Sequence, residues 1–390
     1  MMKIPMSSPD LTDLERQAVM DVFNTTYLSL GPKVIEFEKA FCDYTGAKHA
    51  VAVNSGTSGL HLTVRACDIG VGDLVITTPF SFVASTNALL FENAVPVFVD
   101  VDPATGNINP ELVAEAARDL MQGGRAAERW LPRRGRGAGM LKAILPVDVF
   151  GQPAALDPIL KTAQTHNLRV IEDSCEALGA VYKDKKAGTI GDFGIFAFYP
   201  NKQMTTGEGG IVITDDEKAA NFMRALRNQG RAPGDTWLSH TFLGYNYRLD
   251  EMSSALGLAQ ISRLEEMLAR REQVAGWYAK YMADIPGIQI PVVVPDTVRM
   301  SWFVYVIRLA PGIDRAELAQ RLEKRGVPIR PYFLPIHLQP YMQERFGYIE
   351  GDYPITEDLG NRGVAVPFSG VMTQEQVEYV CEVLRQEIGR

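Results

Sequence analysis

Short apolar runs alternate with amphipathic segments from about residue 48 to about residue 215. The apolar runs are rich in Val and Ile, and they predict buried strands at His49–Val53, Leu74–Thr77, Val95–Val101, Ala143–Val149 and Leu168–Ile171. The segments between them have helical periodicity and predict helices at Ser58–Cys67, Ala84–Phe91, Glu111–Leu120 and Leu156–Thr165. Strands that alternate with helices indicate an α/β fold with a mainly parallel sheet and helices on both faces. Ligands bind such sheets at the carboxyl ends of the strands, where we therefore expect the chemistry.

The chain on either side of this core predicts more helices and a second domain. Thr12 and Glu15 have the spacing of a capping box and predict the start of a helix. Residues 249–284 predict one long helix, which Pro286 ends. Further along, the sequence predicts strands at Ser301–Leu309 and Val327–Arg330 and helices at Arg315–Lys324 and Gln374–Ile388. We therefore expect a large α/β domain with an N-terminal arm (residues 1–255) and a smaller α+β C-terminal domain (residues 256–390), joined by the long helix.

Residues 121–140 interrupt the periodic pattern. Five arginines stand there among glycines: Arg125, Arg129, Arg133, Arg134 and Arg136. The segment has no helical or strand period, so we interpret it as a solvated, mobile surface loop. A phosphate-binding flap is the second interpretation.

Composition narrows the class of protein. The 390 residues are 46% hydrophobic and 22% charged, and the net charge of −8 argues against nonspecific nucleic-acid binding. No run reaches the roughly 18 apolar residues that a membrane span needs. The four cysteines lie far apart without a Cys-x-x-Cys pair, which favours free thiols over disulfides or a metal site. The N-terminus has no apolar signal-peptide region, so we expect a cytoplasmic enzyme without membrane or nucleic-acid partners.

Two groups that follow the first strands are candidates for ligand binding. The small residues Asn54, Ser55, Gly56 and Thr57 leave backbone N–H groups open at a helix N-terminus, where phosphate binds well. The more common role of such a sequence is simply to cap the helix. Phe80 stands after the second strand, where an aromatic ring can stack on a heterocycle, although most such rings belong to the core.

Two charged residues follow later strands. Asp173 follows the predicted strand Leu168–Ile171 and is suited to bind a protonated ring nitrogen, although a helix cap is the commoner role. Lys202 follows an aromatic strand and precedes a Gly-rich turn; a lysine held among apolar groups reacts with carbonyls, whereas most loop lysines are solvated charges. A phosphate cradle, an aromatic ring, a carboxylate and a lysine, all placed after strands, together indicate pyridoxal phosphate binding.

Motifs occur in a fixed order along nearly the whole chain. They are Ile4-Pro5, residues 30–38, 54–57, 146–153 and 172–174, Lys202 with residues 205–210, and residues 244–252, 330–332 and 337–340. Together they closely resemble the DegT/StrS-type sugar aminotransferases, a branch of the fold type I pyridoxal-phosphate enzymes. The resemblance implies a seven-stranded, mainly parallel sheet and a smaller C-terminal domain.

The same resemblance implies roles for particular residues. Lys202 would bind the cofactor covalently and then carry protons, and Asp173 would keep the pyridine nitrogen protonated. The other cofactor-binding positions that it implies are Gly56 and Thr57 at the phosphate, Phe80 on the ring, Glu176 beside the cofactor, and Asn246, which reaches the phosphate from the neighbouring subunit. Arg248 and His337 match positions on the substrate side. The match at Asn246 implies a homodimer with shared active sites.

Two features depart from the family pattern. Relatives usually have Ser between the two aromatic residues before the lysine, and its hydroxyl contacts the phosphate; this chain has Ala197. One missing hydrogen bond corresponds to about 0.5–1.5 kcal/mol. Residues 121–140 also look longer than the corresponding segment of relatives.

The leading functional interpretation is amination of a nucleotide-linked keto-sugar with L-glutamate as the donor. Residues 205–210 resemble relatives that act at C4 of a 4-keto-6-deoxyhexose more than those that act at C3. A cyclitol ketone aminotransferase is the alternative within the same chemistry. The family's dehydratases replace the lysine with His, so Lys202 argues against dehydration, and a non-catalytic regulatory protein would have no reason to keep Lys202, Asp173 and Asn246 together. The sequence leaves the nucleotide and the sugar stereochemistry open.

Overall fold

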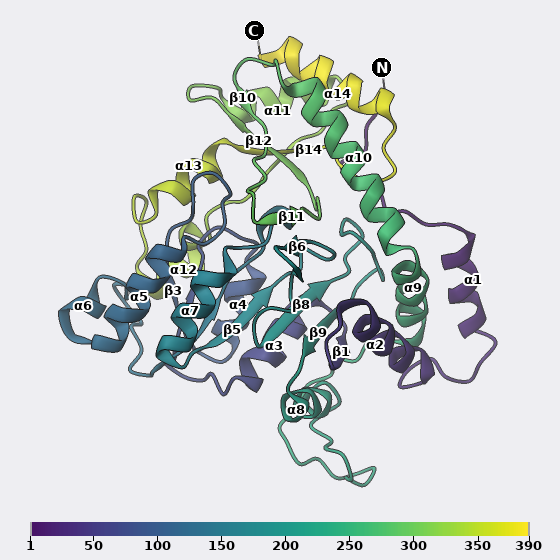
Figure 1. The fold of residues 1–390 in the computed structure, drawn as a ribbon, viewed down its shortest axis with the longest axis vertical. Coiled ribbons are helices and arrows are strands. Elements are labelled where there is room, and N and C mark those ends of the chain that lie inside the picture. Colours follow the sequence, from purple (N-terminus) through teal and green to yellow (C-terminus); the bar gives the residue numbers. More distant parts are fainter. Residues whose placement is uncertain (1, 389–390) are drawn as a thin grey trace.

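A seven-stranded sheet forms the centre of the protein in a computed structural model that describes residues 2–388 (Figure 1). Its strand order is β1-β9-β8-β5-β4-β2-β3. β9 runs antiparallel to β1 and β8, and the other neighbouring strands of this sheet pair in parallel. The carboxyl ends of all its strands except β9 therefore lie at one edge. The bounds are β1 (His49–Val53), β2 (Leu74–Thr77), β3 (Val95–Phe98), β4 (Leu141–Leu145), β5 (Arg169–Asp173), β8 (Phe193–Ala197) and β9 (Gly210–Thr214).

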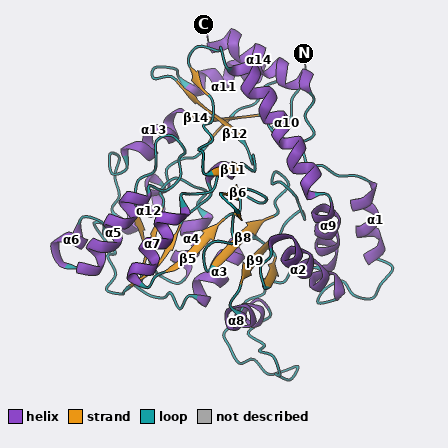
Figure 2. Ribbon diagram, in the orientation of Figure 1, coloured by secondary structure: helices purple, strands orange, loops and turns teal. Residues whose placement is uncertain are grey.

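Helices cover both faces of this sheet, as Figure 2 shows with purple helices around orange strands. One face packs against α3 (Gly56–Ala66), α4 (Ala84–Phe91) and α8 (Glu217–Arg227). The other face packs against α5 (Pro110–Gln122), α7 (Leu156–His166) and α2 (Pro32–Thr45). Successive side chains of a strand point to opposite faces. Val51 and Val53 of β1 therefore pack on the face that α3 covers, while Ala50 and Ala52 pack on the face that α2 covers. The predicted α/β fold class is confirmed.

A smaller antiparallel sheet forms a second unit at the top of Figure 1. Its strands are β10 (Ile288–Gln289), β12 (Tyr305–Leu309), β14 (Gly363–Val366) and β13 (Arg330–Pro331), in that order. Helices α10 (Leu264–Met282), α11 (Arg315–Lys324) and α14 (Gln374–Ile388) share its core. A short sheet of β11 (Thr297–Arg299), β6 (Val181–Tyr182) and β7 (Lys185–Lys186) lies separately.

The segment with α12 (Pro340–Phe346) and α13 (Pro354–Arg362) returns to the central sheet. Met342 and Phe346 belong to the core on one face of that sheet, and Phe333 and Leu359 belong to the core on the other. Residues 256–390 thus contribute to more than one core. The division at residue 255 stays a prediction.

Local sequence signals placed several elements correctly. β1, β2, α4, α11 and α14 have the predicted bounds, and α1 (Asp13–Val22) begins with the predicted capping box at Thr12. The single long helix over 249–284 is wrong, because α9 (Glu251–Ser262) and α10 are separate helices with non-helical Arg263 between them. The Arg263 guanidinium binds Glu15 at 2.8 Å and Asp10 at 3.1 Å, so contacts to the N-terminal arm hold this residue outside the helical geometry.

Residues 121–140 are not a solvated loop throughout, which corrects that part of the prediction. They contain the short helix α6 (Gly124–Glu128), and Trp130 packs against the core under α5. Arg129 pairs with Asp119 at 2.6 Å, and Arg133 binds Asp352 through two hydrogen bonds of 2.5 and 2.7 Å. Two of the five arginines are therefore held by carboxylates elsewhere in the chain. Within residues 2–388, no helix is long and apolar enough to cross a membrane.

Candidate active site

A cavity of about 640 Å³ opens at the carboxyl edge of the central sheet. Its walls come from the loops after β1, β2, β5 and β8 and from residues 331–339. Five predicted site residues, from segments far apart in the sequence, line it together: Gly56, Thr57, Asp173, Glu176 and Lys202. The volume lies in the range usual for small-molecule sites, about 300–1,000 Å³.

The N-terminus of α3 forms one wall of the cavity. Ser55 caps the helix, since its Oγ accepts the Ser58 N–H at 3.1 Å. The first amides of a helix have no partner within the helix and attract anions, which suits Gly56 and Thr57 to a phosphate. A Cβ at Gly56 would lie 2.7 Å from the Ala197 Cβ, so glycine permits the close approach of α3 to β8. Ala197 also lines the cavity and presents a methyl group where relatives have a hydroxyl.

Asp173 is held by two hydrogen bonds at the end of β5. Its Oδ2 accepts the Ser85 hydroxyl at 2.6 Å, and its Oδ1 accepts the Cys175 N–H at 3.2 Å. The Asp173 side chain is buried, and it lines the cavity together with Ser85 of α4. Sequence reasoning missed Ser85, whose contact with Asp173 joins residues 88 positions apart. The carboxylate therefore has a fixed orientation toward any ligand in the cavity.

Lys202 and Glu176 form a charged pair within the same cavity. The Lys202 Nζ lies 3.8 Å from the Glu176 Oε1 and 3.9 Å from the centre of the Phe303 ring. Glu176 is buried, and its Oε2 accepts the Phe150 N–H at 2.9 Å. Burial raises the pKa of the Glu176 carboxyl, while the neighbouring Lys202 opposes that rise. The lysine amine thus has both an aromatic face and a proton-accepting carboxylate beside it.

Phe82, not Phe80, is the aromatic residue of this loop that lines the cavity, which corrects the prediction. The side chain of Phe80 is 2% exposed and packs edge-on against Phe150 and Phe333. Phe82 is 64% exposed and faces the cavity. Phe80 and Phe82 lie in an irregular loop after β2, where no strand or helix period indicates which ring points inward.

His337 does not reach the cavity, contrary to its predicted place on the substrate side. It is fully buried, and its Nε2 lies 2.9 Å from the Glu357 Oε1. Burial lowers the pKa of His337 although Glu357 opposes this effect. Its neighbours Leu334 and Gln339 line the cavity instead. The histidine therefore supports the segment that carries these two residues.

Asn246 and Arg248 lie outside the cavity of their own chain. Asn246 is exposed, and its carbonyl accepts the Asn54 amide at 3.4 Å. Arg248 is half-buried and donates to the Asn228 side chain at 3.1 Å. Their predicted roles toward cofactor and substrate stay predictions, since one subunit by itself does not bring them to the site.

The groups in the cavity fit pyridoxal phosphate. An amine, a fixed carboxylate, an open helix N-terminus and an exposed aromatic ring all face one space, and these are the groups that an aldehyde, a ring nitrogen, a phosphate and a flat heterocycle require. Lys202 would hold the cofactor, Asp173 would hold a proton on its ring nitrogen, and Gly56 with Thr57 would hold its phosphate. Phe82 is placed to cover a ring face.

Comparisons with known proteins agree with this site. The sequence model of the DegT/DnrJ/EryC1/StrS aminotransferase family matches residues 9–385. The chain is 38% identical to a GDP-perosamine synthase of Caulobacter vibrioides over 98% of both chains. Its structure resembles S. venezuelae DesV with a TM-score of 0.88 and 30% identity over all of both chains. It also resembles the PLP form of the putative sugar aminotransferase Spr1654 of Streptococcus pneumoniae, with a TM-score of 0.88 and 25% identity over 100% of this chain and 99% of that one.

Proposed function

The chain belongs to the DegT/DnrJ/EryC1/StrS aminotransferase family, and from this premise we propose that it transfers an amino group from L-glutamate to C4 of a nucleotide-linked 4-keto-6-deoxyhexose. It is an aminotransferase, and its cofactor is pyridoxal phosphate, as in that family. The observation that carries the proposal is that Lys202 and Asp173 face one cavity. A reactive amine and a fixed carboxylate are the two protein groups that amino transfer needs.

Two observations support the nucleotide-sugar substrate. A relative that shares nearly the full length of the chain is a GDP-perosamine synthase, whose name describes a product linked to GDP. Residues 205–210, which resemble relatives that act at C4, include Glu208 and Gly209 in the cavity wall. The same motif shapes the turn after Lys202, since the Thr205 hydroxyl donates to the Phe198 carbonyl at 2.9 Å. The motif is therefore placed to affect both the lysine and the substrate.

Each side chain has a separate task in the proposed reaction. When bound, pyridoxal phosphate supplies a carbonyl that reacts with amines and a ring that accepts electrons. Lys202 would hold the cofactor through its amine and, once that amine is free, would move a proton at the substrate carbon. Asp173, fixed by Ser85 and the Cys175 N–H, would hold a proton on the ring nitrogen of the bound cofactor. Phe303 presents its aromatic face to the amine, and Phe82 lines the same cavity.

A product-mass assay tests the substrate proposal. We expect the enzyme, with L-glutamate, to convert at least one of UDP-, dTDP- and GDP-4-keto-6-deoxyhexose to the mass of the corresponding primary amine. A free cyclitol ketone serves as the alternative substrate, and Lys202→Ala enzyme is the matched control. Amination of the cyclitol ketone alone would overturn the proposed sugar substrate. A product that has lost a hydroxyl group without gaining nitrogen would instead indicate dehydration.

A homodimer with shared active sites is the second part of the proposal. Residues 229–248 include a loop that projects beyond α8 at the bottom of Figure 1, and Trp237, Leu238 and Leu243 expose apolar side chains on this loop. Exposed apolar surface on such a projection indicates a protein partner. Because Asn246 belongs to this segment and lies outside its own chain's cavity, a second copy of the chain is the partner that gives it a role.

Mixing two defective variants tests this sharing. Lys202→Ala and Asn246→Ala, unfolded together and reassembled, should form mixed dimers in which one of the two sites has both native residues. We expect activity above that of either parent, measured as amino transfer from L-glutamate. Asn54→Ala mixed with Lys202→Ala is the control, because the Asn54 side chain supports the Asn246 backbone within one chain. If mixed dimers form by native mass spectrometry and activity does not rise, Asn246 does not act across the interface.

A further inference from the structure

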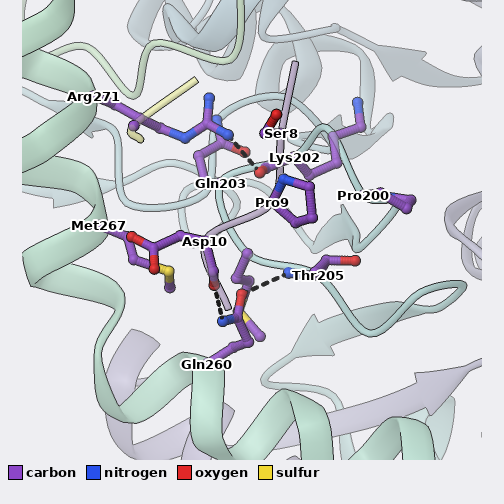
Figure 3. A pocket seen from close by; sticks show the side chains of 12 residues that line it. Ser8, Pro9, Asp10, Pro200, Lys202, Gln203, Thr205, Gln260, Met267 and Arg271 are labelled. Carbon is purple, nitrogen blue, oxygen red and sulfur yellow. Dashed lines mark hydrogen bonds between the residues drawn. The ribbon is translucent and has the colours of Figure 1, made fainter. Parts of the chain in front are cut away.

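Arg271 of α10 lies buried directly beneath the loop that carries Lys202. Its side chain is 4% exposed. Figure 3 shows it reaching from the helix toward the main chain of Lys202, with Gln260 holding the same loop further along. α10 belongs to the core of the smaller sheet, so a residue of that unit contacts the loop at the active site.

The guanidinium binds four backbone carbonyls. Its Nη2 donates to the Lys202 carbonyl at 2.7 Å and to the Asn201 carbonyl at 3.3 Å. Its Nη1 donates to the carbonyls of Trp302 and Phe303, both at 3.2 Å. The planar fork of arginine can bridge two chain segments in this way, which the single ammonium of lysine cannot do equally well. One side chain therefore joins residues 201–202 to residues 302–303.

A buried guanidinium of this kind is costly to the fold. Within residues 2–388, no ion pair shorter than 4 Å involves Arg271, so carbonyl dipoles take the place of water, and Asp10 acts on the guanidinium only as a more distant opposite charge. Burial lowers the pKa of Arg271 to about 10, and the side chain therefore remains charged at neutral pH. An apolar residue would fill the space at lower desolvation cost, but it would not hold the four carbonyls.

Both segments that Arg271 joins determine the surroundings of the Lys202 amine. The main chain at residue 202 determines where the lysine side chain begins. The centre of the Phe303 ring lies 3.9 Å from the Nζ at the other end of that side chain. We propose that Arg271 is a positioning residue for Lys202. It holds the lysine main chain and the Phe303 ring at a fixed distance, so that the amine stays directed into the cavity where the cofactor would bind. Displacement of a reacting group by about 1 Å costs roughly a hundredfold in rate.

Covalent capture of pyridoxal phosphate tests this proposal independently of any substrate. Apo protein is mixed with increasing pyridoxal phosphate, borohydride stops the reaction at set times, and mass spectrometry counts the label on Lys202. For Arg271→Met we expect the saturating rate constant of capture to fall about tenfold to a hundredfold, while the half-saturating concentration stays near the wild-type value. Arg271→Lys should recover part of the rate, because an ammonium binds some of the carbonyls. Arg270→Met, an exposed arginine on the same helix, should behave as wild type.

The rate constant separates positioning from a purely structural role. If Arg271 only stabilised the fold, its variants would show less folded protein and a smaller final label, but the remaining protein would capture the cofactor at the wild-type rate. That result overturns the proposal. If Arg271→Met does not fold, Arg271→Lys decides: a wild-type capture rate in that variant also overturns it, and a reduced rate at normal final label supports it.

Discussion

Lys202→Ala enzyme is expected to bind pyridoxal phosphate without a covalent bond. Its rate of amino transfer should be lower than that of the wild type by a factor of about a thousand or more. In the proposed reaction, alanine removes both the amine that would hold the cofactor and the base that would move the proton at the substrate carbon. The phosphate cradle at Gly56 and Thr57 and the carboxylate of Asp173 remain, so binding persists. Borohydride treatment and peptide mapping of the wild-type enzyme should place the label on Lys202, and amino transfer from L-glutamate measures the loss.

Lys202→Arg is the matched control for this variant. It keeps a positive charge near Glu176 and Phe303 but supplies no unprotonated amine at working pH. Both variants should therefore be inactive. Activity in Lys202→Arg would show that the charge and not the amine matters. Label on Lys186, a half-buried lysine whose pKa is lowered by burial, would show that a different lysine reacts.

Asp173→Asn enzyme is expected to lose about a hundredfold or more in turnover with a modest loss of cofactor. The change keeps the shape of the side chain, and its amide oxygen still accepts one of the hydrogen bonds from Ser85 and Cys175. It removes the negative charge that, in the proposed reaction, would hold the proton on the ring nitrogen. Because this charge acts mainly in the transition state, turnover should fall more than binding, as kcat and the dissociation constant of the cofactor will measure.

Glu176→Gln separates Asp173 from the other carboxylate of the cavity. Glu176 lies 3.8 Å from the Lys202 amine and accepts the Phe150 N–H. A glutamine keeps that hydrogen bond, and we expect a smaller effect than in Asp173→Asn. Near-normal turnover in Asp173→Asn together with a large loss in Glu176→Gln would assign the ring nitrogen to Glu176.

Much of the site was predictable from residues that follow strands. Gly56, Thr57, Asp173, Glu176 and Lys202 line one cavity because parallel strands bring their carboxyl ends to one edge. Phe80 and His337 were placed wrongly because each lies in an irregular segment. There the direction of a side chain depends on which distant residues surround it, as Phe333 does for Phe80 and Glu357 for His337.

The sequence by itself determined the fold class, the family, and the choice of Lys202 and Asp173 as candidate site residues. Strands such as β1 and helices such as α4 have the predicted bounds because backbone hydrogen bonding and the burial of one face repeat with a short period that the sequence shows directly. Only the tertiary structure decided that α9 and α10 separate at Arg263, that Phe82 faces the cavity, and that Arg271 lies beneath Lys202. These features depend on contacts between residues far apart in the chain, such as Arg263 with Asp10 and Arg271 with Phe303, which leave no period in the sequence.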